Sequence, residues 1–339
     1  MIVGFAGVLV LAIALTVALR PWEQRRAPAT DTAPPTAPAP QSSARSGGES
    51  AAPVGPSPAG SAASDWQPAF PIRAAFYYPW FPEAWQQAGM SPFTHYHPSL
   101  GQYNVSSPSV LSAHVQAMRY AGLQAAIASW WGRGSATDRR IGQLLGAAAG
   151  QNFRWSVYYE AEGQGDPTVG QLTGDLTYLR DRYGSDPRFL RIDGRFVVFV
   201  YAEGHDGCAM ADRWKRANTV GAYVVLKVFS GYRGCASQPD GWHQYGPAKD
   251  VSDHTPFAYS VSPGFWKASE STPRLARDPE RWRVALRAMI ASNARFQLVT
   301  TFNEWGEGTS VESATEWASP SGMGDYLDAL HDILGGARR

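Results

Sequence analysis

Two glutamates three positions apart, Glu304 and Glu307, directly follow an apolar stretch near the end of this 339-residue chain. On a helical or tight-turn segment, positions i and i+3 share one face, so both carboxylates can reach one small ligand. Hydrolysis of a glycosidic bond generally needs two carboxyl groups beside the scissile bond, one of them protonated. Neighbouring carboxylates in a partly dry cleft raise one pKa, which supplies that acid. The pair therefore predicts glycoside chemistry, and a solvated loop carrying two acids is the alternative.

Aromatic and acidic residues also follow the other apolar stretches of the chain. Aromatic faces stack on sugar rings, while carboxylates bind sugar hydroxyls and transfer protons, so this composition is typical of carbohydrate-processing sites. Glu203 is a further carboxylate that an ordinary retaining mechanism would use with Glu304 or Glu307. His243 is a candidate substrate contact, and a histidine buried in the hydrophobic core is an equally good interpretation of it. The candidate substrate contacts are Tyr77, Tyr78, Trp130, Trp131, Glu160, His243, Tyr259, Asn303 and Trp305.

Short apolar stretches alternate with helical periodicity through residues 66–339, which predicts an α/β fold with a single (β/α)8 barrel. The carboxyl ends of barrel strands meet on one face, so the candidate residues gather there. No Gly-x-Gly-x-x-Gly follows the first strand, which disfavours a doubly wound dinucleotide fold. Expected strands are Ile72–Tyr77, Ala125–Ser129, Trp155–Tyr159, Phe196–Tyr201, Tyr223–Phe229, Trp242–Tyr245, Ala258–Val261 and Gln297–Thr301. Expected helices are Ser109–Tyr120, Arg139–Ala149, Gly170–Tyr183, Ala211–Ala217, one from an Asp278 cap to Ala291, and Tyr326–Leu334.

The first 65 residues differ in composition from the rest of the chain. Residues 1–19 contain no charged side chain, which predicts a membrane anchor or a cleaved signal peptide. Residues 20–65 are rich in Pro, Ala and Ser, so we expect a disordered linker that acts as a spacer, or a tail without a role. The expected location is extracytoplasmic, either secreted or attached to a membrane through an uncleaved anchor.

The chain carries 30 basic and 29 acidic side chains, and neither the linker nor the predicted domain has a large net charge. This balance argues against a nucleic-acid partner and favours a neutral polymer. The two cysteines, Cys208 and Cys235, predict one disulfide in an exported domain, with two separate thiols as the alternative. His95 and His97 lack the acids that a metal site needs, so we expect no metal. We expect no cofactor and a monomer.

Several motifs together resemble glycoside hydrolase family 99, the endo-α-mannosidases and endo-α-mannanases, over roughly residues 70–335. The most specific is Phe302-Asn303-Glu304-Trp305-Gly306-Glu307-Gly308-Thr309, with Glu312 beyond it. Weaker matches are Phe76-Tyr77-Tyr78-Pro79-Trp80, His97-Pro98, Gly101-Gln102-Tyr103, Ala121-Gly122, Ser129-Trp130-Trp131-Gly132 and Tyr158-Tyr159-Glu160.

The resemblance implies a (β/α)8 barrel without a metal and a retaining, endo-acting mechanism on an α-linked, mannan-like glycan. By motif match, Glu307 is the general acid/base, and Glu304 deprotonates the sugar 2-hydroxyl that attacks the anomeric carbon. Glu160 would bind substrate hydroxyls, and Tyr78, Trp130 and Trp131 would form subsite walls. This chain departs from the family pattern at two places. Well-studied members carry His at the position of Gly306, and they carry Glu-Pro-Tyr where this chain has Glu160-Ala161-Glu162.

Two other functions fit the same sequence. A non-catalytic glycan-binding protein would keep the aromatic walls and need no proton transfer. A cell-envelope polysaccharide-assembly protein would fit the anchor and the linker equally well.

Overall fold

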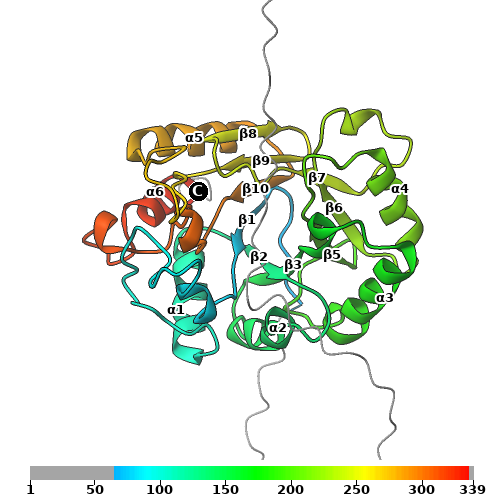
Figure 1. The fold of residues 1–339 in the computed structure, drawn as a ribbon, viewed down its shortest axis with the longest axis horizontal. Coiled ribbons are helices and arrows are strands. Elements are labelled where there is room, and N and C mark those ends of the chain that lie inside the picture. Colours follow the sequence, from blue (N-terminus) through cyan, green and yellow to red (C-terminus); the bar gives the residue numbers. More distant parts are fainter. Residues whose placement is uncertain (1–64, 336–339) are drawn as a thin grey trace, which may run out of the picture.

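The computed structural model describes residues 65–335, which form a parallel barrel (Figure 1). Its sheet runs in the order β7-β6-β5-β3-β2-β1-β10-β9, and every pair along this path is parallel. The strands are β1 Ile72–Tyr77, β2 Ala125–Trp130, β3 Arg154–Tyr159, β5 Arg195–Val200, β6 Tyr223–Lys227, β7 Gly241–His243, β9 Ala258–Val261 and β10 Phe296–Val299. The expected eight barrel strands are therefore confirmed.

Side-chain hydrogen bonds connect the two ends of this sheet. The Ser260 hydroxyl of β9 donates to the carbonyl of Gln244, directly after β7, and the Thr300 hydroxyl donates to the carbonyl of Tyr245. Two short strands lie outside the parallel set. β8 (Val251–His254) forms an antiparallel hairpin with β9, and β4 (Arg191–Ile192) pairs antiparallel with β5.

Helices surround the strands in Figure 1. They are α1 Pro108–Tyr120, α2 Ala136–Ala147, α3 Val169–Leu179, α4 Cys208–Ala217, α5 Pro279–Ala291 and α6 Asp325–Gly335. These match the expected helices. Within residues 65–335, a short 3-10 turn (Tyr232–Gly234) stands between β6 and β7, and the β8 hairpin stands between β7 and β9, where a full (β/α)8 barrel has helices.

Capping residues explain two helix starts. The Asp278 carboxylate accepts hydrogen bonds from the backbone N–H groups of Glu280 and Arg281 at 2.9 and 3.0 Å, and Pro279 occupies the first turn, as expected. The Ser135 hydroxyl accepts from the N–H of Asp138, so α2 begins at Ala136, earlier than the expected Arg139. The last turn of the expected third helix, Arg180–Gly184, is a π-turn.

The disulfide Cys208–Cys235 is present and joins the first residue of α4 to the loop after β6. This confirms the predicted pairing. The anchor or signal at residues 1–19 and nearly all of the linker at 20–65 lie outside the described residues, so the division into three segments stays a prediction. Among residues 65–335, no helix has the length and apolar character needed to span a bilayer.

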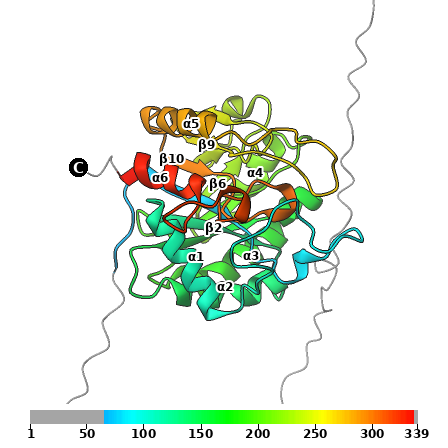
Figure 2. The same ribbon diagram turned by 90° about the vertical axis from the view of Figure 1, so that its left-hand side faces the viewer.

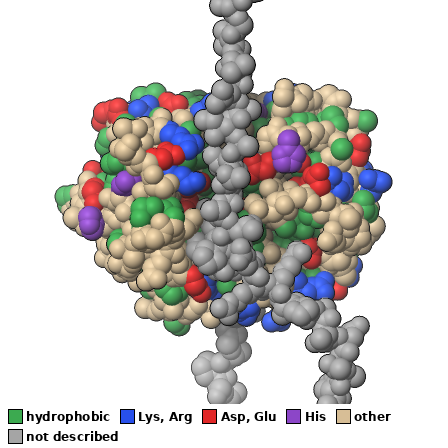
Figure 3. Space-filling view, viewed as in Figure 1, with side chains coloured by type: hydrophobic (Ala, Val, Ile, Leu, Met, Phe, Trp, Pro, Cys, Tyr) green, Lys and Arg blue, Asp and Glu red, His purple; other side chains and the backbone are tan. Residues whose placement is uncertain are grey.

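The segments that follow β1 and β10 lie side by side at one end of the barrel (Figures 1 and 2). This is the end at which the parallel strands finish, so it carries the residues expected to form the site. On the coloured part of the face shown in Figure 3, acidic and basic side chains are interspersed, in line with the balanced charge of the sequence.

Candidate active site

A short turn after β10 presents Glu304 and Glu307. Glu304 precedes the 3-10 turn Trp305–Glu307, and its backbone N–H donates to the Thr301 hydroxyl at 2.9 Å. Gly308 ends the turn with a φ of +64°, and a Cβ there would lie 2.6 Å from the carbonyl oxygen of Trp266. Glycine is therefore required at this position. The three-residue spacing is realised as a tight turn, as the sequence predicts.

Gly306, between the two acids, is packed against an aromatic ring. A Cβ at this position would lie 2.8 Å from the Phe93 ring and 3.2 Å from Oε1 of Glu304. Phe93 therefore occupies the space that a side chain at position 306 would need. The packing of Phe93 therefore accounts for a glycine at position 306, where well-studied family members carry His.

Two buried tyrosines connect the glutamates to the neighbouring strands. The hydroxyl of Tyr245, beyond β7, donates a hydrogen bond to Oε2 of Glu307 at 2.9 Å. Burial first, and then the charges of Glu160, Glu304 and Glu307, raise the pKa of Tyr78 well above its ordinary value. Burial, Glu307, Tyr78 and Glu304 do the same to the pKa of Tyr245. Glu304 and Glu307 therefore act on both phenol groups, and Glu160 acts on that of Tyr78.

Two further tyrosines carry this cluster toward β5. Burial, followed by Glu203, Glu160 and Glu307, raises the pKa of Tyr201. Burial and Glu160 are the two largest causes that raise the pKa of Tyr158. Glu160 is buried directly after β3 and Glu203 is half-buried after β5. The structure thus brings Glu160, Glu203, Glu304 and Glu307 together, including the alternative second carboxylate.

A cavity of about 600 Å³ opens beside this cluster. Glu307, Tyr245, Tyr201 and Lys227 form one wall, and the loop between β7 and β8 forms the other. The remaining lining residues are Gln244, Gly246, Pro247, Ala248, Lys249, Val251, Ser252, Asp253, His254, Phe265 and Arg274. The space is of the size that small-ligand sites have.

Asn303 holds the β1 and β10 loops together. Its side-chain oxygen accepts from the Tyr78 N–H at 2.7 Å, and its amide nitrogen donates to the Tyr78 carbonyl at 3.1 Å. The side chain is fully buried. Asn303 therefore positions Tyr78, and the predicted direct contact with substrate is replaced by this backbone clamp.

Tyr77 and Trp305 belong to a buried polar network away from the cavity. The Tyr77 hydroxyl lies 2.9 Å from Nδ1 of His114, whose Nε2 lies 3.0 Å from Glu312. The Trp305 indole N–H donates to Glu312 and to the Tyr103 hydroxyl. Both rings are fully buried and neither lines the cavity, so their predicted contact with substrate stays a prediction that this packing does not favour.

Trp130, the predicted subsite wall, is buried against the helix layer. Its indole N–H donates to Asp138 of α2 at 2.8 Å, and its ring packs against Tyr159 and Tyr178 with no exposed surface. Alternate strand residues face opposite sides of a sheet, and Trp130 faces the helices. Trp131, the next residue, is half-buried, and its backbone N–H is bonded to Thr137.

His243 and Tyr259 also lie outside the cavity lining. His243 is completely buried among Phe76, Tyr158 and Phe199, and its Nε2 lies 3.1 Å from the Tyr158 hydroxyl. This is the core-histidine alternative. Tyr259 is in register with Gln297, whose amide donates to the Met289 carbonyl of α5. Tyr259 therefore faces the helix layer, and its predicted role as a substrate contact stays a prediction that this orientation does not favour.

Side chains that reasoning from sequence did not select are Tyr201, Lys227 and Tyr245. Each stands at a strand end among apolar residues, so its position relative to the barrel axis depends on the exact end of the strand. Lys227 carries the clearest signal, because a lysine that closes an otherwise apolar strand has no reason to be there as core packing.

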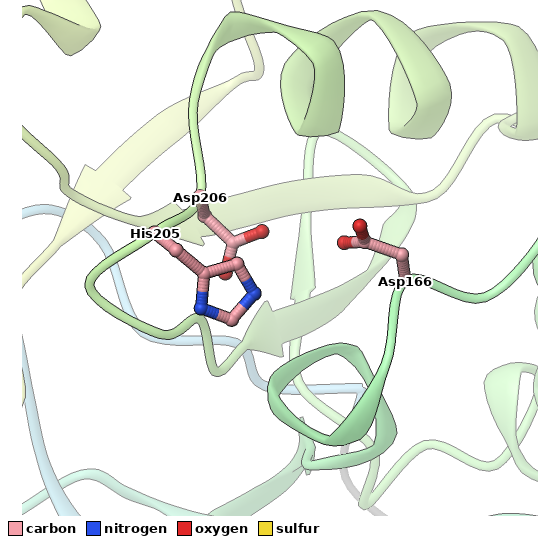
Figure 4. A group of neighbouring side chains, drawn as sticks. All are labelled: Asp166, His205 and Asp206. Carbon is pink, nitrogen blue, oxygen red and sulfur yellow. The ribbon is translucent and has the colours of Figure 1, made fainter. Parts of the chain in front are cut away.

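Asp166, His205 and Asp206 lie within reach of one another (Figure 4). Arg213 already donates to Asp166 at 2.8 Å, and the Glu203 N–H donates to Asp206 at 2.6 Å. We therefore assign no metal to this group.

The two loop histidines have other contacts. His95 stacks on Trp266 at 3.9 Å between ring centroids and contacts the Lys267 carbonyl. His97 pairs with Glu316.

A barrel with carboxylates at the ends of its strands is an arrangement that glycoside hydrolases use. The family model for glycosyl hydrolase family 99 matches residues 74–228. The chain is 24% identical over 282 residues to a glycoprotein endo-alpha-1,2-mannosidase of Mus musculus, across 69% of this chain and 59% of that protein. It is 23% identical over 290 residues to a glycoprotein endo-alpha-1,2-mannosidase-like protein of Homo sapiens, across 69% of this chain and 60% of that one.

A solved structure agrees with these sequence matches. The family 99 endo-alpha-mannosidase of Bacteroides thetaiotaomicron, in complex with Bis-Tris propane, aligns with a TM-score of 0.66 and 20% identity, over 80% of this chain and 98% of that one. The chain resembles glycosyl hydrolase family 99 in sequence over residues 74–228 and in fold. It spans 59–61% of the length of the curated relatives that it matches.

Proposed function

We propose that the protein is a retaining, endo-acting glycosidase that cleaves α-linked mannosyl glycans. The observation that carries the proposal is the turn after β10, which presents Glu304 and Glu307 three residues apart, with Tyr245 hydrogen-bonded to Glu307. The match of residues 74–228 to the family 99 model and the similarity to endo-alpha-1,2-mannosidases support mannose as the sugar.

The proposed reaction has two steps. In the first, Glu304 takes the proton of the sugar 2-hydroxyl, whose oxygen bonds to the anomeric carbon, while Glu307 protonates the departing glycosidic oxygen. In the second, Glu307 takes a proton from water, whose oxygen attacks the anomeric carbon of the 1,2-anhydro sugar, and Glu304 returns its proton to the 2-oxygen. Two inversions give net retention. The hydrogen bond from Tyr245 favours the charged form of Glu307 that the second step requires.

The test compares hydrolysis of an α-mannan by the wild type, Glu304→Gln and Glu307→Gln. Each substitution removes a proton-transfer group and keeps the side-chain shape, so we expect turnover to fall by about 10²–10⁴-fold with an unchanged circular dichroism spectrum. Glu280→Gln, at an exposed position on α5, is the matched control. Near wild-type turnover in either site variant would exclude that residue, and binding of glycans without cleavage would favour the non-catalytic alternative.

We also propose that the protein acts outside the cytoplasm. The Cys208–Cys235 disulfide supports this location, because such bonds persist in oxidising compartments.

A further inference from the structure

Lys227, the last residue of β6, lines the cavity beside Glu307 and has no part in the proposed proton transfers. Its ammonium donates to the carbonyl of Ala202 and lies 4.6 Å from the centroid of the Tyr201 ring. These two contacts hold the nitrogen in place. Both partners belong to the segment that directly follows β5.

The charge of Lys227 is poorly compensated. Within residues 65–335, no carboxylate oxygen lies within ion-pair distance of its nitrogen. Burial lowers the pKa of Lys227, and the more distant charges of Glu203, Asp206 and Glu160 oppose that effect. An ammonium has three N–H donors, and Ala202 accepts from only one of them. Lys227 is half-buried at the cavity, so its other two donors can bind a ligand there.

The surrounding charges do not exclude an anion. Lys249 and Arg274 line the same cavity, opposed by Asp253 and Glu307. Arg274 is paired with Glu270 at the rim. In the first proposed step Glu307 enters as the protonated acid and carries no charge. The charged side chains that line the cavity are then Lys227, Lys249 and Arg274 against Asp253, while Glu203, Asp206 and Glu160 act on Lys227 from outside the lining.

We propose that Lys227 binds an anionic substituent, a carboxylate or a phosphate, on the sugar that occupies the cavity. This inference rests on the proposed function, since it takes the cavity as a glycan subsite. The preferred substrate is then an acidic glycan, such as a mannan bearing uronate or phosphoryl groups. Neutral sugars would still bind, through hydroxyl groups that accept from the ammonium, but with less gain because they bring no charge.

The test measures affinity by calorimetry for three ligands: α-mannotriose, its 6-phosphate and its uronic acid. The measurements are made in the Glu307→Gln background, so that binding is separate from cleavage. We expect one or both acidic ligands to bind about 10–100-fold more tightly than the neutral one, as a charge-assisted hydrogen bond predicts. The larger of the two gaps identifies the anion. Lys227→Met should remove the gap.

Lys215→Met, at an exposed position on α4, is the matched control and should keep the gap. Lys227→Met replaces a half-buried charge with an apolar group of similar length, so its thermal midpoint should not fall, and Lys227→Gln is the second variant if it does. Equal affinities for all three ligands, no measurable binding, or a gap that persists without Lys227 would overturn the inference. If the wild type does not hydrolyse an α-mannan, that result counts against the proposed function instead. The binding measurements are separate from it because they need no turnover.

Discussion

At the scale of single residues, the hydrogen bond between Tyr245 and Glu307 is the contact nearest to the proposed chemistry. Tyr245 is buried and its hydroxyl lies 2.9 Å from Oε2 of Glu307. A neutral donor to a carboxylate contributes more than an ordinary hydrogen bond. Its removal should therefore weaken the catalyst without disturbing the fold.

We predict that Tyr245→Phe lowers kcat on an α-mannan by about 10–100-fold, because Glu307 loses the donor that stabilises its charged form. KM should change by less than kcat. Tyr223→Phe, a tyrosine on β6 outside the cavity lining, is the control. A kcat within twofold of wild type would show that the Tyr245 hydroxyl is not needed.

His243 gives a second residue-scale prediction, concerning stability. Burial, and then the charge of Lys227, lower the pKa of His243 to about 3 from an ordinary 6.5. Between these values the unfolded chain binds a proton that the folded protein excludes, so stability is full above pH 6.5 and falls as the pH drops toward 3.

Replacing His243 by the non-titrating Gln should reduce the slope of the unfolding free energy between pH 6.5 and 3 by up to about 1.4 kcal/mol per pH unit. Urea titrations at several pH values measure this slope for both proteins. The absolute stability of the variant is irrelevant to the comparison. Equal slopes would mean that His243 is not held neutral by the fold.

At the scale of elements, the loops after β1 and β10 form one unit. Asn303 binds both the N–H and the C=O of Tyr78, which fixes a phenol group next to Glu304. Because these backbone groups are buried, no water replaces the amide when it is removed.

Asn303→Ala should therefore destabilise the protein by about 2–4 kcal/mol in urea unfolding, from two lost buried hydrogen bonds. It should also lower kcat, although Asn303 does not line the cavity. Asn152→Ala, at a surface position before β3, is the control. A change below about 0.5 kcal/mol would show that the loops hold their positions without the clamp.

The sequence predicted the strands well because each buried strand is an apolar, β-branched or aromatic run with no competing helical period. The Glu304–Glu307 turn was predictable for the same reason, since it follows such a run. Which side of a strand a residue faces was not predictable. Trp130 and Tyr259 look like sugar-stacking residues, yet a one-residue alternation turns both toward the helices.

Long-range packing accounts for the other differences. Trp305 stands between the two acids in sequence, but its indole reaches Glu312 and Tyr103 in the opposite direction. The β8 hairpin, which replaces a helix, creates one wall of the cavity. Neither feature has a local sequence signal. Lys227 gains its significance only when β5 and β6 are paired and Tyr201 and Ala202 lie beside it.

At the scale of the whole molecule, the disulfide joins the segment that follows β5 to the segment that follows β6. Cys208 and Cys235 are 27 residues apart, and they bracket β6 with its cavity lysine. A closed loop of this length stabilises the folded state by restricting the unfolded chain, by about 3–4 kcal/mol in the chain-entropy model.

The Cys208→Ser, Cys235→Ser double variant should lose about this amount in urea unfolding. Reductant should lower the stability of the wild type toward that of the variant and leave the variant unchanged. A wild type that is equally stable with and without reductant would show that the bond contributes little to the fold.

We propose that this barrel cleaves α-mannosyl linkages by means of the two glutamates after β10. The most direct measurement is product analysis by NMR during digestion of an α-mannan, with an α-glucan and a β-mannan in parallel. We expect the protein to release oligosaccharides from the α-mannan alone, with the α configuration in the first products, and we expect no release by Glu307→Gln. Products of the β configuration, or undiminished release by Glu307→Gln, would contradict it.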